Sequence, residues 1–168
     1  PKTGPVYEGL VHDYRMDEAL AASEPFAVRR IPLDDVLDDF FLDPTCDHLI
    51  GAARGGHEGQ VVNLNVRRKI AVVDLPGLPH LGSGITWQWT GRPVLATPNL
   101  KEGVVTVIDM KSWKTLSQIK TAGPGFFLRS HENSRYAWVD AFNSANKDTL
   151  QIIDKRSLEV VASVKPSP

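Results

Sequence analysis

The chain repeats one pattern three times, and this repeat limits its possible folds more than any other feature of the sequence. Each copy contains short runs in which small, polar and β-branched residues alternate, as they do in half-buried β-strands. The copies align on Asn65, Asp109 and Asp154, which are 44 and 45 residues apart. A period of roughly 40–50 residues with about four short strands in each unit is typical of the blades of a β-propeller.

The repeat therefore predicts an all-β fold of four-stranded antiparallel blades. We expect blades at residues 34–78, 79–122 and 123–168, preceded by residues 1–33, which would hold the end of an earlier blade and a short helical segment at 16–23. A propeller closes its ring with roughly 4–8 blades, because a blade buries both faces of its sheet only between two neighbours. About three blades are too few, so the sequence predicts a fragment of a larger propeller.

Composition argues against several kinds of partner. The chain has 19 basic and 20 acidic residues and no polybasic run, so we expect neither nucleic acid nor an anionic membrane surface as a partner. No run of ~18 apolar residues is present to span a membrane. The single cysteine, Cys46, allows no internal disulfide and no Cys–Cys metal site, so we predict no metal site. Open sheet faces at the ends of the fragment would favour an oligomer.

Asp109 and Asp154 each begin a short polar turn between two strand-like runs. Aspartate in this place satisfies backbone amides of a tight turn. We therefore interpret both residues as turn residues and not as catalytic acids.

Candidate chemistry lies in the three segments that connect one predicted blade to the next. In a propeller, such a segment leaves the outermost strand of one blade and enters the innermost strand of the next, so that it ends beside the central channel. Residues 32–41, 75–85 and 121–127 have this predicted position. Side chains from several blades can therefore meet at one site.

The second segment presents a histidine among residues that shape a loop. His80 is flanked by Gly77, Pro79, Gly82 and Gly84. Glycines allow unusual backbone angles and the close approach of a ligand. Such a histidine can bind a ligand, transfer a proton or hydrogen-bond an anion. The alternative is a loop histidine bonded to a neighbouring carbonyl group.

The first segment carries four carboxylates, Asp34, Asp35, Asp38 and Asp39. A solvated acidic loop is one interpretation. The other is that one of them, Asp38 above all, faces the channel near His80 and acts as its acid–base partner.

Two further features are ambiguous. Trp87 and Trp89 alternate onto one face of a strand, where packing between blades explains them better than a stacking platform does. Arg54 ends a strand before two glycines and could bind a carboxylate bidentately, or be solvated.

Four segments in a fixed order resemble the haem d1 propeller of the cytochrome cd1 nitrite reductase family. They are residues 43–53, 79–84, 92–97 and 130–140. The family includes relatives that act in haem d1 biosynthesis, namely a dihydro-haem d1 dehydrogenase cytochrome and a cofactor-free propeller. The resemblance extends roughly from Leu33 to the end of the chain.

The resemblance implies an eight-bladed propeller with haem d1 at the mouth of its channel. His80 matches one of two histidines that lie over the haem in the reductase, and the other falls at Asp38, give or take one residue. Ser83 stands where the reductase has an arginine. The resemblance thus implies His80 and Asp38 as catalytic residues, and we expect the tetrapyrrole to contact His80, Gly82, Ser83, Gly84 and Arg54.

These differences favour the biosynthesis branch, because a histidine with an aspartate suits proton transfer on a tetrapyrrole better than it suits an anion such as nitrite. The first hypothesis is therefore part of a propeller that oxidises or processes a haem d1 precursor. A nitrite reductase domain and a non-catalytic propeller for protein contacts are the alternatives. We expect haem d1 or a precursor in the full-length protein, none in this fragment, other haem d1 pathway proteins as partners, and a periplasmic location.

Overall fold

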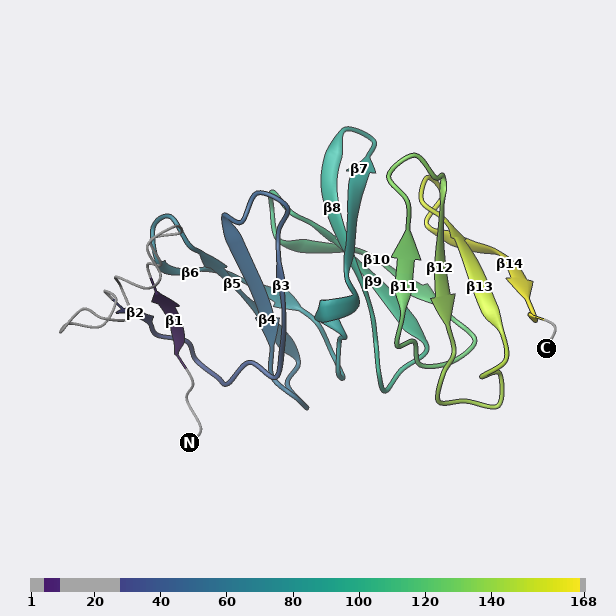
Figure 1. Ribbon diagram of the computed structural model, residues 1–168, viewed down its shortest axis with the longest axis horizontal. Coiled ribbons are helices and arrows are strands. Elements are labelled where there is room, and N and C mark those ends of the chain that lie inside the picture. Colours follow the sequence, from purple (N-terminus) through teal and green to yellow (C-terminus); the bar gives the residue numbers. More distant parts are fainter. Residues whose placement is uncertain (1–4, 10–27, 167–168) are drawn as a thin grey trace, which may run out of the picture.

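The computed structural model describes residues 5–9 and 28–166, whose regular secondary structure is almost entirely β-strand (Figure 1). Three four-stranded antiparallel sheets follow one another along the chain, and each is built from four consecutive strands. The predicted all-β fold of four-stranded blades is therefore confirmed. The helical segment expected at 16–23 lies outside the described residues.

The first sheet consists of β3 (Asp39–Leu42), β4 (His48–Ala52), β5 (Glu58–Asn63) and β6 (Arg68–Asp74). The second consists of β7 (Ile85–Trp89), β8 (Arg92–Pro98), β9 (Val104–Asp109) and β10 (Lys114–Lys120). The third consists of β11 (Leu128–Ser130), β12 (Tyr136–Asp140), β13 (Leu150–Asp154) and β14 (Glu159–Val164). The strands β1 (Val6–Gly9) and β2 (Val28–Ile31) pair with each other, and a short 3-10 helix, η1 (Leu81–Ser83), precedes β7.

The sheets lie beside one another in chain order, as blades do (Figure 1). Strands in the same position of successive sheets contact each other: β6 contacts β10, β10 contacts β14, and β7 contacts β11. The fourth strands of successive sheets are therefore neighbours, and so are the first strands of the second and third sheets. This arrangement brings the segments that enter β3, β7 and β11 to one side of the molecule.

Alternating residues bury both faces of the first two sheets. Ile50 of β4 shares a core with Leu95 and Ile108 of the second sheet, whereas its neighbour Leu49 shares a core with Ile31 of β2. Successive side chains of a strand point to opposite faces, so the apolar runs of β4 and β8 serve two neighbours at once. The third core, between the second and third sheets, contains Val94, Ala96, Val105, Val107, Leu128, Ala137, Val139 and Ile153.

The other face of the third sheet is exposed within the described residues. Tyr136 and Trp138 alternate with buried Ala137 and Val139, and they are 39% and 41% exposed. Trp138 pairs with Ile152 across the sheet. We call this surface the open face; its residues are Tyr136, Trp138, Leu150, Ile152 and Val164.

One polar turn recurs between the third and fourth strands of every sheet. Asp109 accepts hydrogen bonds from the backbone N–H groups of Lys111 and Ser112 at 2.7 and 3.0 Å. Asp154 accepts one from the N–H of Arg156 at 2.8 Å. The predicted role of both aspartates in turns is confirmed.

The matching residue of the first sheet is Asn63 and not Asn65, so the sequence alignment was wrong by two residues there. Asn63 pairs with His48 as Asp109 pairs with Val94. Its side-chain oxygen accepts from the N–H groups of Asn65 and Val66, both at 3.0 Å. Asparagine stands at both 63 and 65, and only the turn geometry distinguishes them.

We predict that Asp154 makes stability depend on pH. The hydrogen bonds from the Arg135 side chain and from the backbone of Arg156 lower the pKa of Asp154 to about 2. A carboxyl group with a lowered pKa stabilises the fold above its ordinary pKa of 3.8, and this contribution disappears as the pH falls toward 2. Asp154→Asn should therefore unfold at a lower temperature than the unmodified chain at about pH 6, and the difference should shrink at about pH 2.

Thermal unfolding followed by circular dichroism measures this effect, with Arg135→Gln as the companion variant that raises the pKa of Asp154. A difference between the unmodified chain and Asp154→Asn that is equal at both pH values would contradict the assignment.

Candidate functional site

His80 lies directly before η1, in the segment that enters β7. Its backbone N–H donates to the carbonyl oxygen of Pro98 at 2.8 Å, and its own carbonyl oxygen accepts from the N–H of Ser83 at 3.0 Å. The loop is thus fixed to the end of β8 on one side and closed by a short helical turn on the other. Such a loop can hold a side chain in a defined direction.

Within the described residues, one of the two nitrogens of the His80 ring makes a hydrogen bond. Nδ1 lies 2.6 Å from the carbonyl oxygen of Phe126, so it must carry a hydrogen and donate it. The ring also packs against that of Phe126, with centroids 4.4 Å apart. In the neutral ring Nε2 then has the free lone pair, and it makes no hydrogen bond within the described residues. The carbonyl contact that was expected as the alternative role therefore orients the ring and leaves Nε2 available.

A second histidine shows the contrast. His48 Nδ1 lies 3.0 Å from Asp43 Oδ2, and His48 Nε2 lies 3.1 Å from the amide nitrogen of Asn63. Both ring nitrogens are therefore engaged. Burial alone would raise the pKa of Asp43, but the hydrogen bonds from His48, Thr45 and the backbone of Asp47 together outweigh it and lower that pKa. This cluster is structural.

Aromatic rings extend the surface beside His80. Phe126 contacts Phe127 and Phe142 with centroid distances of 4.9 and 5.4 Å, and Phe127 is 52% exposed. Phe40, at the entry of the first sheet, is also exposed. We call Phe126, Phe127 and Phe142 the aromatic rim. Exposed rings grouped at one loop cluster suit a flat, largely apolar ligand.

Arg129 holds a guanidinium group next to the aromatic rim. Its Nη1 donates to the carbonyl oxygen of Leu128 at 2.9 Å and to Ser83 Oγ at 3.0 Å, and its central carbon lies 5.5 Å from the ring centroid of Phe127. One edge of the group is therefore anchored, while Nε and Nη2 make no hydrogen bond within the described residues. A fixed guanidinium with a free edge is suited to bidentate binding of a carboxylate.

Asp39 is linked to the His80 loop, whereas Asp38 is not. The two carboxylate oxygens of Asp39 lie 3.1 and 3.2 Å from the N–H of Gly82. Asp38 accepts a hydrogen bond from the backbone N–H of Arg54, and its side chain is exposed. Within the described residues no hydrogen bond joins Asp38 to His80. The catalytic role of Asp38 stays a prediction.

The other predicted binding residues have different environments. Ser83 is only 1% exposed, and its Oγ accepts hydrogen bonds from the N–H of Leu128 at 2.9 Å and from Arg129. A Cβ at Gly84 would lie 3.0 Å from Leu95, which shows that this glycine is required by packing. Gly82 and Arg54 are exposed. The roles of these four residues toward a tetrapyrrole stay predictions.

Sequence reasoning named Asp39 among four carboxylates but preferred Asp38, and it missed Arg129 and the aromatic rim. The two phenylalanines at 126 and 127 were visible in the sequence at the third blade entry. The available signal for Arg129 was its place two residues after this pair. The Arg129 side chain bends back to Ser83, which is 46 residues away in the sequence. Local sequence patterns do not reveal such a contact.

The fold and this loop cluster define a β-propeller portion that presents one histidine and an aromatic surface at the entries of its blades. The chain belongs to the family described as Cytochrome D1 heme domain, which matches residues 16–168. This confirms the resemblance noted from the sequence.

Individual relatives agree with the family. The chain is 45% identical over 148 residues to dihydro-heme d1 dehydrogenase of Pseudomonas aeruginosa, covering 88% of this chain and 30% of that protein. It is 33% identical over 103 residues to Protein NirF of the same organism, covering 61% of this chain and 24% of NirF. The chain thus spans less than a third of the length of these relatives.

Solved structures show the same fold. The structure of dihydro-heme d1 dehydrogenase NirN in complex with DHE matches with a TM-score of 0.84 and 41% identity, over 98% of this chain and 33% of that one. Hydrazine synthase of Kuenenia stuttgartiensis matches with a TM-score of 0.64 at 17% identity, over 78% of this chain and 36% of that one, which concerns the fold alone. In the part of the chain that the structure describes, no helix has the length and apolar character needed to cross a membrane.

We predict that Ser83 matters for stability. Ser83→Ala would remove the acceptor for the buried N–H of Leu128, and an unsatisfied buried donor costs about 1–3 kcal/mol. The free energy of unfolding, measured by urea denaturation, should fall by that amount. Ser157→Ala, at an exposed position of the turn after β13, serves as the control and should change it by less than about 0.5 kcal/mol. Equal effects of the two variants would refute the role of Ser83.

Proposed function

We propose that the chain is part of a haem d1 biosynthesis propeller in which the His80 loop faces a dihydro-haem d1 type tetrapyrrole during its dehydrogenation. The observation that carries this proposal is the His80 ring, whose Nδ1 is held by the Phe126 carbonyl while Nε2 is free. The similarity to a dihydro-heme d1 dehydrogenase over 88% of the chain supports the choice of substrate.

The side chains around His80 fit such a substrate. The exposed ring of Phe127 offers an apolar surface for a flat macrocycle. The free edge of Arg129 can bind one of the carboxylates that tetrapyrroles carry, and Arg54 is a second exposed guanidinium on the preceding sheet. Gly82, in the His80 loop, is exposed and has no side chain that would keep a ligand away.

His80 supplies the proton chemistry in this proposal. Dehydrogenation removes two protons and two electrons from the substrate. Nε2 takes up one proton, and the carboxylate of Asp38 at the neighbouring blade entry takes up the other. The electrons pass to an acceptor outside this chain.

Nitrite reduction is less well supported by the same residues. Asp38 and Asp39 both lie at the entry of the first sheet, and carboxylates there repel a small anion. A non-catalytic propeller built for protein contacts would not bind the tetrapyrrole at all, so binding separates it from the first proposal.

The test is binding and turnover of dihydro-haem d1 by the full-length protein, followed by absorbance. His80→Ala should lower turnover by about 10²–10⁴-fold, the usual contribution of a general base, and leave binding largely intact. Arg129→Gln should weaken binding about tenfold with a smaller effect on turnover of the bound substrate. The control is His57→Ala, an exposed histidine in a turn of the first sheet.

Turnover by His80→Ala equal to that of the His57→Ala control would overturn the catalytic role. Absence of any absorbance change on titration would favour the non-catalytic alternative. We also propose, from family membership, a periplasmic location and contacts with other haem d1 pathway proteins; fractionation of the native cells and cross-linking test these two points.

We further propose that the isolated 168-residue chain associates through the open face. Trp138 and Ile152 are paired apolar side chains on a face that no described residue covers, and exposed apolar patches of this kind drive association. Sedimentation velocity should show concentration-dependent oligomers that Trp138→Gln with Ile152→Thr abolishes. Val72→Thr, at an exposed position of β6, is the control. Oligomers that persist in the double variant would refute this contact.

A further inference from the structure

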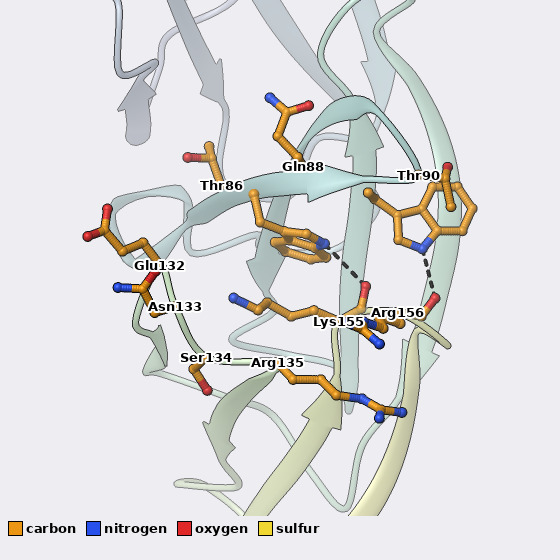
Figure 2. Close-up of a pocket in the computed structure, with 11 residues that line it drawn as sticks. Thr86, Gln88, Thr90, Glu132, Asn133, Ser134, Arg135, Lys155 and Arg156 are labelled. Carbon is orange, nitrogen blue, oxygen red and sulfur yellow. Dashed lines mark hydrogen bonds between the residues drawn. The ribbon is translucent and has the colours of Figure 1, made fainter.

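A pocket of about 790 Å³ lies between the second and third sheets (Figure 2). It is at the opposite end of the strands from the His80 loop. β7 leads from that loop down to the pocket, and the turn between β11 and β12 lies at the far end of β11 from the aromatic rim. The pocket is lined by residues 86–90 of the second sheet and by residues 132–135, 155 and 156 of the third. It is therefore separate from the site proposed for the tetrapyrrole.

Two tryptophans form a fixed wall of this pocket. The indole N–H of Trp87 donates to the carbonyl oxygen of Lys155 at 3.2 Å, and that of Trp89 donates to the carbonyl oxygen of Arg156 at 2.9 Å (Figure 2). Both indoles also pack against the core between the sheets, as expected from the sequence. The bonds hold the turn at 154–157 against β7, so the aromatic wall and the cations stay together.

The pocket holds a buried ammonium group without a counter-ion. Lys155 is only 7% exposed, and its Nζ donates to the carbonyl oxygen of His131 at 3.2 Å. Within residues 5–9 and 28–166 this is its only hydrogen bond, although an ammonium has three donors. Burial lowers the pKa of Lys155, and its Nζ makes no ion pair with a carboxylate in the described part of the chain. An anion would supply the missing partner.

The neighbouring charges leave the pocket positive. Arg135 is paired with Asp154, so these two neutralise each other. Arg156 is exposed and makes no ion pair within the described part of the chain. Glu132 is the one carboxylate in the pocket lining, and it does not approach Lys155 closely enough for an ion pair. Lys155 and Arg156 are therefore the available cations.

Comparison of the three repeats shows that Lys155 departs from a common pattern. Leu64, Met110 and Lys155 occupy the same place: each follows the turn residue, and their N–H groups donate to the carbonyl oxygens of residues 47, 93 and 135. Leu64 and Met110 are apolar and pack against the cores of their sheets. Met110 is one of the residues that line a cavity of about 340 Å³ between the first and second sheets. An apolar residue at position 155 would also pack well, so packing alone does not explain the lysine there.

We propose that the pocket binds a small organic carboxylate with an aromatic body. The carboxylate lies on Lys155 and Arg156, and the body lies against Trp87. The volume is within the range of about 300–1,000 Å³ that is usual for ligand pockets, and an aromatic wall with a few convergent polar groups is their usual composition. This site is independent of the proposed action on a tetrapyrrole.

The test uses 2-naphthoate as the probe and the indole N–H signals in NMR spectra of the 168-residue chain as the readout. Saturable shifts should appear at Trp87 and Trp89. Neutral 2-naphthylmethanol, which has the same body without the charge, should bind about tenfold more weakly. Lys155→Met, which introduces the residue found at the equivalent position 110, should fold normally and weaken 2-naphthoate about tenfold.

Arg156→Gln provides a second variant, and Lys111→Gln is its control because Lys111 has the equivalent place in the turn of the second sheet. Arg156→Gln should weaken binding and Lys111→Gln should not. The proposal is overturned if the charged and neutral probes bind equally, if both lysine and arginine variants bind as the unmodified chain does, or if shifts occur only at Trp138 on the open face.

Discussion

Burial of each sheet between two neighbours is the constraint on which the rest of the structure depends. A four-stranded sheet of this size has two apolar faces, as Leu49 and Ile50 show on adjacent positions of β4. Neither face is covered within its own sheet, so every sheet needs another on each side. The described chain satisfies this need at its internal junctions and leaves the open face of the third sheet unsatisfied.

The same constraint explains where side chains with chemistry occur. Sheets that stack face to face leave their connecting segments at the ends of the strands, where contacts between sheets are few and polar groups remain accessible. His80 belongs to a segment of this kind, and Asp39 and Arg129 lie at the beginnings of β3 and β11, directly after such segments. The pocket around Lys155 lies at the other end of the strands. The site around His80 uses residues from three sheets and the pocket around Lys155 uses residues from two, so neither exists in one repeat alone.

Much of the architecture could be predicted from the sequence, and less of the site. A period near 45 residues and the alternation of apolar side chains identify the blades, because these patterns follow directly from strand geometry. The loop around His80 could be recognised because glycines and a proline mark it. The choice between Asp38 and Asp39 could not be made, since adjacent carboxylates differ only in the direction that the turn before β3 gives them. Arg129 escaped notice because its position depends on contacts with Ser83 across a sheet boundary.

The helix η1 is connected to more of the molecule than its three residues suggest. On one side Gly82 is bonded to Asp39 at the start of the first sheet, and on the other Ser83 is bonded to Leu128 at the start of the third. η1 therefore connects the first strands of the three sheets, β3, β7 and β11. Any ligand that displaces the His80 loop must pull on both neighbours, and any change in the spacing of the blades must move His80. The spacing of the blades and the direction of the His80 side chain are thus coupled.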